Sequence, residues 1–248
     1  MKFSIITVTY NSDSTLRKTL ESVSQQTWPN IEHIIIDGGS EDKTLELVNL
    51  FPHVSKCISE RDSGIYDAMN KGLKEATGDV VGFLNSDDWF FSNSIIEEYA
   101  NIFNSNNVDA VYGDLCFVKN DINTNIVRKW VSSSYKEGFF KKGWVPPHPT
   151  FYCKNNIYKQ YGNFNQNLLF AADFDIMCRF FNKVDFKSIY SPGLKVNMRL
   201  GGATTKSIKN IISGNIEIFD SLKENNLKPG IDFIAWKLIN RISQLINR

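Results

Sequence analysis

The chain has 248 residues, and its 28 Lys and Arg against 27 Asp and Glu leave a net charge of +1. This length suffices for one large α/β domain or two small ones with a substantial core. Because the charges balance, no global field would attract nucleic acid or an anionic surface, and we expect no nucleic-acid partner.

Cysteine usage and hydropathy indicate the compartment. The cysteines form no CxxC pair, which argues against a zinc site or a disulfide framework and favours a reducing cytoplasm; they are Cys57, Cys116, Cys153 and Cys178. No apolar stretch approaches the roughly 18 residues that a membrane-spanning helix needs. We therefore expect a protein that is neither secreted nor threaded through a membrane.

The first hundred residues alternate between apolar runs and amphipathic segments. Residues 3–8 and 31–36 are typical of buried parallel strands, and between them Leu16, Leu20 and Val23 recur at helical spacing. The alternation continues with a helix at 43–50, a strand at 54–59, a helix at 65–76 and a strand at 80–84. This order predicts a doubly wound α/β sheet, with ligands at the carboxyl ends of its strands, near Thr9, Asp37 and residues 85–88.

The pattern changes after about residue 108. Residues 110–118 and 126–131 are typical of a strand pair, and a loop rich in Gly, Trp, Pro and His follows. No linker of Pro, Gly or Ser interrupts the chain. We therefore predict one domain at 1–228 with two functional halves, 1–107 and 108–228, followed by a C-terminal helical segment at 229–248.

Asp87 and Asp88 directly follow the apolar strand at 80–84. A hard divalent cation such as Mg²⁺ or Mn²⁺ takes oxygen ligands, commonly one or two carboxylates plus substrate phosphates. The pair therefore suits a metal site that neutralises a departing diphosphate. The alternative is that the two side chains cap the next helix or hydrate a turn.

Two further polar clusters open predicted helices. Asp67, Asn70 and Lys71 share a helix face and suit a ribose or phosphate, although a capped surface helix also explains them. Asp173 and Asp175 begin an otherwise apolar helix, where the helix dipole favours acids for structural reasons alone. The functional interpretation is that one of these two acids is a general base.

Five segments occur in order along the chain: SIITVTYN at 4–11, IDGGSED at 36–42, the helix start at 62–72, NSDD at 85–88 and ADFD at 172–175. Together they resemble GT-A fold glycosyltransferases of family 2, in the bacterial subgroup that builds O-antigen and capsular polysaccharides. The resemblance implies a Rossmann-like mixed sheet with flanking helices. It also implies that residues 1–107 bind a nucleotide-sugar and residues 108–228 an acceptor.

The resemblance assigns the nucleotide site position by position. Thr9 and Asp37 match residues that line the uracil pocket, with Tyr10 beside Thr9 in the same segment. Asp67 and Asn70 match the helix beside the nucleotide.

The metal site follows from the same resemblance. Asp87 matches the metal-binding carboxylate of the DxD motif, and Asp88 matches a position near the donor sugar or the metal. Asn85 stands where many relatives have the first Asp, which removes a negative charge and leaves the ribose contact to an amide.

Asp173 matches the catalytic base of the family, but Ala172 replaces the usual neighbouring Glu, so Asp175 is the competing base. His148 lies in WVPPHPT at 144–150, between the two halves. Because proline fixes its own φ and holds the preceding residue extended, this loop can hold His148 rigidly over the diphosphate or the acceptor. A structural role for a lone His is the alternative.

The resemblance implies inverting transfer of a hexose or N-acetylhexosamine from a UDP-sugar to a polyprenyl-diphosphate-linked saccharide, with Mn²⁺ or Mg²⁺ as cofactor. A rival class, the nucleotidyltransferases, generally has a Gly-rich loop after the first strand, whereas TYNSD at 9–13 has no glycine. A carbohydrate-binding module, the second rival, needs aromatic platforms but no metal carboxylates. Trp89, Trp130 and Trp144 could supply such platforms.

Residues 231–247 are predicted to form an amphipathic helix. Lys237, Arg241 and Arg248 flank one apolar arc, which consists of Ile231, Ile234, Ala235, Leu238, Ile239, Ile242, Leu245 and Ile246. The pattern predicts a peripheral helix on the inner face of the cell membrane, close to a lipid-linked acceptor. The alternative is packing against its own domain or a partner subunit in a homo-oligomer.

Overall fold

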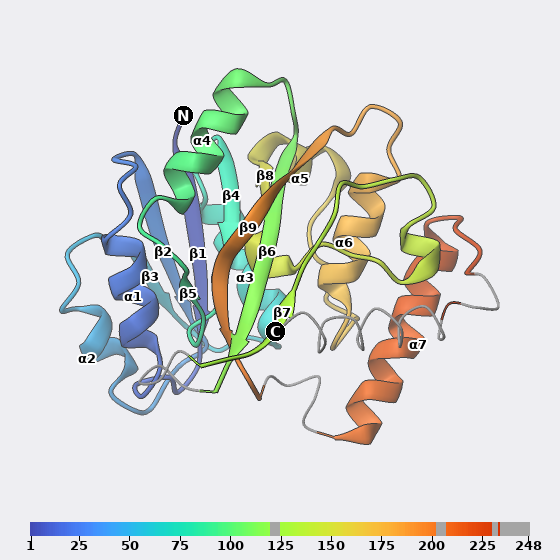
Figure 1. The fold of residues 1–248 in the computed structure, drawn as a ribbon. Coiled ribbons are helices and arrows are strands. Elements are labelled where there is room, and N and C mark those ends of the chain that lie inside the picture. Colours follow the sequence, from blue (N-terminus) through green and yellow to red (C-terminus); the bar gives the residue numbers. More distant parts are fainter. Residues whose placement is uncertain (120–124, 202–206, 230–232, 234–248) are drawn as a thin grey trace.

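Figure 1 shows the computed structural model of the protein, which describes residues 1–119, 125–201, 207–229 and 233. Within these residues nine strands form one mixed sheet in the order β3-β2-β1-β4-β8-β6-β9-β5, with β7 paired to β6 outside this path. The strands are β1 (Phe3–Thr9), β2 (Ile31–Asp37), β3 (Val54–Ser59), β4 (Val80–Phe83), β5 (Trp89–Phe90), β6 (Ala110–Val118), β7 (Ile126–Trp130), β8 (Tyr152–Lys154) and β9 (Ser188–Arg199).

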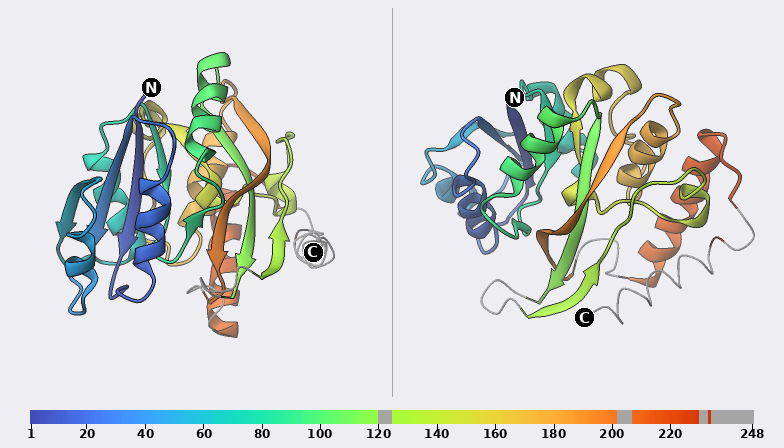
Figure 2. Two further views of the ribbon diagram at one scale, coloured as in Figure 1. Left: turned by 60° about the vertical axis from the view of Figure 1, so that its left-hand side comes forward. Right: turned by 45° about the horizontal axis from the view of Figure 1, so that its top comes forward.

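Helices cover both faces of this sheet (Figures 1 and 2). One face carries α3, α5 and α6, with α7 packed against α6, and the opposite face carries α1, α2 and α4. Two short 3-10 helices, η1 and η2, lie before β8. The helices are α1 (Leu16–Ser24), α2 (Thr44–Val48), α3 (Ile65–Glu75), α4 (Ile95–Ser105), η1 (Phe140–Lys142), η2 (His148–Thr150), α5 (Asn155–Tyr161), α6 (Ala172–Phe181) and α7 (Ile208–Glu224).

The side chains of the first strands explain this layering. Ile34 and Ile36 of β2 pack on the face covered by α3, whereas Ile35 packs beneath α1 and α2. Successive side chains of a strand point to opposite faces, so a strand covered on both sides is apolar throughout. β1 pairs in parallel with β2 and β4, and β2 pairs in parallel with β3. The predicted α/β architecture of this region is confirmed.

The second half of the chain extends the same sheet. β8 runs antiparallel to both β4 and β6, while β6 and β9 are parallel. The predicted strand pair is confirmed as β6 and β7, which are antiparallel. β9 is absent from the sequence prediction, because its Pro192 and Gly193 (φ 101°) are residues that rarely occur inside strands.

Two glycines permit the close packing behind the site. A Cβ on Gly72 of α3 would overlap the side chain of Ile6 in β1, and a Cβ on Gly82 of β4 would overlap the ring of Tyr152 in β8. α3 and β8 can therefore approach the central strands closely, and these elements carry or support the pocket described below.

The predicted C-terminal helix at 231–247 lies outside the described residues except for Phe233. This side chain is buried, and its ring centroid lies 4.8 Å from that of Phe219 in α7. Among the helices that the structure describes, none is long and apolar enough to cross a membrane.

Candidate active site

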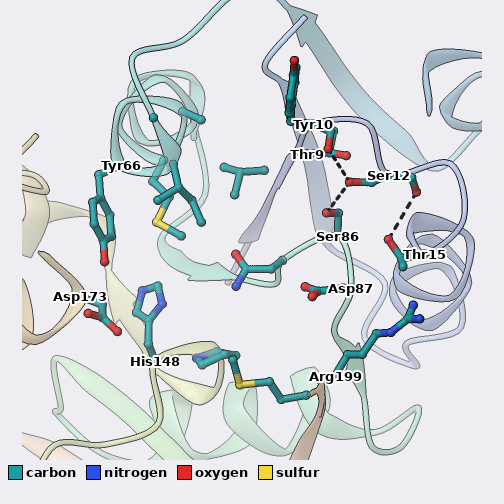
Figure 3. A pocket seen from close by; sticks show the side chains of 18 of the residues that line it. Thr9, Tyr10, Ser12, Thr15, Tyr66, Ser86, Asp87, His148, Asp173 and Arg199 are labelled. Atoms are coloured by element: carbon teal, nitrogen blue, oxygen red, sulfur yellow. Dashed lines mark hydrogen bonds between the residues drawn. The ribbon is translucent and has the colours of Figure 1, made fainter. Parts of the chain in front are cut away.

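A pocket of about 680 Å³ opens at the carboxyl ends of β1 and β4. The amino ends of α3 and α6, the turn after β4, the start of η2 and the carboxyl end of β9 surround it (Figure 3). The predicted site residues that line it are Thr9, Tyr10, Asn85, Asp87, His148 and Asp173. The fold therefore brings together groups from both halves of the chain.

The turn after β4 holds the paired carboxylates. The Asp88 N–H donates to the Asn85 carbonyl at 3.0 Å, and the Thr19 hydroxyl of α1 donates to the Asp88 carbonyl at 2.7 Å. Asp88 is 1% exposed, and its Oδ1 accepts from the Arg199 N–H at 3.3 Å. These bonds anchor the turn to α1 and β9, while Asp87 lines the pocket.

The two neighbouring carboxylates disfavour each other's ionisation. Burial and then the charge of Asp87 raise the pKa of Asp88 well above its usual range. Burial also raises the pKa of Asp87, and the positive charge of Arg199 opposes this effect. A divalent cation at this place would relieve the repulsion.

The oxygen atoms of the turn fit such a cation. Among the described residues, Oδ2 of Asp88 and Oδ1 of Asn85 are buried without a hydrogen-bond partner, and buried acceptors are costly unless something satisfies them. In the same part of the chain no three His, Cys, Asp or Glu side chains cluster as a metal site. Mg²⁺ and Mn²⁺ sites of this kind take further ligands from substrate phosphates.

Arg199 is a site residue that sequence reasoning missed. It lies at the end of β9, lines the pocket and acts electrostatically on Asp87 (Figure 3). No motif surrounds it. The parallel pairing of β9 with β6 places it here, and this pairing is not readable from local sequence.

Asp173, Tyr66 and His148 form a second group in the pocket (Figure 3). The Tyr66 hydroxyl lies close to the N–H groups of Ala172 and Asp173, at the start of α6. Burial and then the charge of Asp173 raise the pKa of Tyr66, so its phenol stays neutral. Tyr66 was not predicted as a site residue, although it lies within the motif at 62–72.

The buried ring of His148 packs against two phenylalanine rings. Its ring stacks on Phe83 with centroids 5.5 Å apart and meets Phe164 edge-on at 5.8 Å. Burial lowers the pKa of His148, against the opposing charge of Asp173, so the imidazole is neutral at pH 7. Within the described residues its buried Nε2 has no hydrogen-bond partner. This nitrogen is therefore available to a ligand.

Asp37 ends β2 but does not line the pocket. It accepts from two N–H groups of the following loop at 3.1 and 2.9 Å and from the Ser59 hydroxyl at 2.6 Å. That loop abuts the pocket wall, because a Cβ on Gly38 would lie 2.6 Å from Oδ2 of Asp62, a lining residue. Its predicted contact with uracil stays a prediction.

Asp67 and Asn70 also lie outside the lining of the main pocket and join α3 to the segment before α6. Asp67 accepts from the Ser63 N–H at 3.0 Å and from Gln166 Nε2 at 3.1 Å. The Asn70 amide donates to the carbonyl of Phe164 and accepts from its N–H, both at 2.9 Å. Their predicted contacts with the nucleotide stay predictions.

Asp175 differs from Asp173 in its surroundings. Its side chain is 6% exposed and forms an ion pair with Arg179 at 3.0 Å, on the same helix. Asp173 lines the pocket and Asp175 does not. This placement favours Asp173 as the acid that reaches a ligand.

Comparison with known proteins identifies the family. The family model described as Glycosyl transferase family 2 matches residues 4–162. The chain belongs to this family. A PGL/p-HBAD biosynthesis glycosyltransferase of Mycobacterium bovis is 30% identical over 186 residues, which cover 73% of this chain and 70% of that protein. An uncharacterized glycosyltransferase of Haemophilus influenzae is 34% identical over 137 residues, 54% of this chain and 53% of that protein.

This family 2 glycosyltransferase is similar in fold to two solved proteins. The first is S. aureus TarS 1–349 in complex with UDP-GlcNAc, with a TM-score of 0.70 at 18% identity. The match covers 100% of this chain and 72% of the TarS chain. This chain spans 43% of a longer TarS structure. The second is the mannosyltransferase PcManGT of Pyrobaculum calidifontis, in complex with GDP-Man and Mn²⁺, with a TM-score of 0.68 at 17% identity. The match covers 98% of this chain and 70% of PcManGT. The predicted GT-A architecture is confirmed.

Proposed function

We propose that this glycosyltransferase is an inverting, metal-dependent enzyme that moves a hexose or N-acetylhexosamine from a UDP-sugar to a saccharide acceptor. One observation carries the proposal: the pocket holds Asp87 near the cationic Arg199, and Asp173 near the neutral His148. A single displacement needs both groups, because charge develops on the leaving diphosphate while a proton leaves the acceptor.

The donor binds over the ends of β1 and β4 in this proposal. Asp87 would hold the Mn²⁺ or Mg²⁺ ion, with Asp88 near the ion or the donor sugar and Asn85 near the ribose, and the ion when bound would neutralise the charge of the diphosphate. Arg199 adds a positive charge at the same place. Oγ1 of Thr9 is buried and, among the described residues, has no hydrogen-bond partner, so it is available to the nucleotide.

Asp173 acts as the general base. The acceptor oxygen forms a bond to the anomeric carbon, the bond from that carbon to the diphosphate oxygen breaks, and the hydroxyl proton passes to Asp173. Attack from the face opposite the leaving group converts an α-linked donor to a β-linked product without an enzyme nucleophile. His148 Nε2 is suited to hydrogen-bond the acceptor or the diphosphate.

The donor, metal and acceptor assignments draw on the comparisons and on the sequence. UDP-sugars are favoured by the resemblance and by the TarS structures with UDP and UDP-GlcNAc, and Mn²⁺ by the PcManGT complex. A lipid-linked acceptor in surface polysaccharide synthesis, used at the cytoplasmic face of the membrane, is favoured by the subgroup resemblance and the amphipathic pattern at 231–247. The mycobacterial relatives are named for PGL/p-HBAD biosynthesis.

A donor panel tests the proposal. Purified protein is incubated with Mn²⁺ and UDP-glucose, UDP-galactose, their N-acetylated forms or GDP-mannose, and release of the nucleoside diphosphate is measured. We expect slow hydrolysis of one UDP-sugar, which EDTA abolishes and excess Mn²⁺ restores. Hydrolysis unaffected by EDTA would contradict the metal role, and a preference for GDP-mannose would contradict the donor class. No hydrolysis of any donor would contradict the donor assignment as a whole.

A further inference from the structure

Glu217 of α7 binds the backbone of the segment that leads into α6. Its carboxylate accepts hydrogen bonds from three consecutive N–H groups, those of Leu169 at 3.0 Å, Phe170 at 2.8 Å and Ala171 at 2.9 Å. α7 lies beside α6 (Figure 1), and Glu217 itself does not line the pocket. One side chain thus fixes three residues of a neighbouring loop.

The N–H groups just before α6 need hydrogen-bond acceptors, and the adjacent N-cap residue does not supply one. Ala171 is the N-cap residue of α6 and has no side chain that can accept a hydrogen bond. The first N–H groups of a helix and the N–H groups just before it need acceptors, and the helix dipole favours a negative charge there. The Glu217 carboxylate supplies, from another helix, acceptor oxygens for the three N–H groups just before α6 and a negative charge near its amino end.

The segment that Glu217 binds, residues 169–171, lies at the pocket. Leu169 and Phe170 line it, and Asp173 follows two residues after Ala171. The next two N–H groups, those of Ala172 and Asp173, lie close to the Tyr66 hydroxyl of α3. Three consecutive N–H groups, from 169 to 171, are therefore held by α7, and Tyr66 of α3 lies beside the two that follow.

We propose that Glu217 is a positioning residue, which sets the pocket wall at 169–170 and the place of Asp173 without touching substrate. The inference rests on the proposed function, in which Asp173 is the base. Reactive groups must be held within a fraction of an ångström, so release of this segment lowers turnover more than donor binding.

Variants of α7 separate this role from general stability. Glu217→Ala removes the acceptor, Glu217→Gln retains one acceptor oxygen, and Asp220→Asn is the matched control, because Asp220 is exposed and pairs with Lys223 on the same helix. We expect turnover of the donor hydrolysed fastest in the panel to fall about 10-fold to 100-fold in Glu217→Ala and less in Glu217→Gln. UDP affinity, measured by calorimetry, stays within about threefold, and Asp220→Asn behaves as the unmodified enzyme.

A double-mutant cycle with Asp173→Asn supplies the deciding measurement. If Glu217 acts through Asp173, Glu217→Ala should lower the residual turnover of Asp173→Asn by less than about threefold. The inference would be overturned if the turnover losses of the two single variants multiply in the double variant. It would also be overturned if Glu217→Ala keeps turnover within about twofold of the unmodified enzyme. In either case Asp173 remains the base. Full turnover in Asp173→Asn alone would instead refute the proposed base. If Glu217→Ala does not fold by circular dichroism, the same comparisons with Glu217→Gln decide.

Discussion

Asp87 and Asp173 differ in their surroundings, and the difference determines which chemistry each can support. Asp87 adjoins a buried carboxylate and an arginine, where a bound cation relieves repulsion. Asp173 lies at the amino end of α6, near a neutral imidazole and a neutral phenol. The first environment suits metal and phosphate, and the second suits acceptance of a proton.

Replacing Asp87 tests the donor side. Asp87→Ala should abolish Mn²⁺-dependent donor binding and nearly all turnover, because metal-ion terms are normally worth several kcal/mol. Binding is measured by calorimetry with UDP in the presence and absence of Mn²⁺. Asp185→Ala, at an exposed position outside the pocket, is the control. Retention of more than about a tenth of the original turnover would contradict the metal role, since a tenfold change is only about 1.4 kcal/mol.

Replacing Asp173 tests the acceptor side. Asp173→Asn should leave UDP affinity nearly intact and lower transfer by roughly 10²-fold or more, the usual contribution of a general base. Asp175→Asn should mainly lower the melting temperature, because it removes the ion pair between the buried Asp175 carboxylate and the partly buried Arg179. If Asp175→Asn alone shows intact UDP affinity with lost turnover, the assignment of the base is wrong.

The pocket residues that can be predicted from the sequence are those at the ends of strands. Thr9, Asn85 and Asp87 follow apolar strands directly, so the carboxyl-end rule places them together. Arg199 and Glu217 were not predictable, because each belongs to an element that pairs or packs across a large sequence separation. Local pattern carries no information on such contacts.

At the element scale, Glu32 ties together the amino ends of β1, β2 and β4, away from the strand ends that carry the pocket. Its carboxylate accepts four hydrogen bonds, from Lys2 Nζ, the Ser4 hydroxyl, and the N–H and hydroxyl of Thr77. Burial alone would raise the pKa of Glu32, but these bonds outweigh it and lower the pKa from 4.5 to about 2.

Glu32→Gln should therefore destabilise the fold in a pH-dependent way. A carboxyl whose pKa is depressed in the folded state stabilises that state above its unfolded pKa, and the contribution is lost as the pH falls from 4.5 towards 2. We expect Glu32→Gln to lower the free energy of unfolding at pH 7 by about 1 to 3 kcal/mol. Urea unfolding at pH 7 and at pH 3 measures the difference, which should shrink at pH 3. A constant difference at both pH values would show that packing, not charge, is responsible.

The elements of the first half were predictable and several of the second half were not. β1, β2 and β4 are largely buried apolar runs separated by amphipathic helices, so the sequence pattern identifies them. β3, at the edge of the sheet, is mostly exposed. β8 has three residues and β9 contains a proline and a glycine, which weakens any strand pattern. α4 was left out although its apolar residues recur at helical spacing.

At the scale of the whole molecule, both halves of the chain contribute strands to one sheet, and the pocket lies where they meet. For a lipid-linked acceptor, the important question is whether the segment at 231–247 contacts membrane or protein. Phe233 is buried against α7. On the helix that the sequence predicts, at about 100° per residue, Phe233 would fall on the side opposite the apolar arc centred near Ile242, so the predicted arc does not include Phe233.

We therefore predict that the apolar arc of the segment at 231–247 binds a membrane surface. Ile242→Glu should abolish sedimentation with vesicles of phosphatidylglycerol and phosphatidylcholine, because it places a charge in the apolar face of an interfacial helix. Ser243→Glu adds the same charge outside the arc and on a different side from Phe233, so it should retain binding and controls for repulsion by the anionic lipid. Both variants should keep donor hydrolysis, since the pocket lies in the sheet. Unchanged vesicle binding in Ile242→Glu, or loss of the folded protein, would show instead that the arc packs against protein.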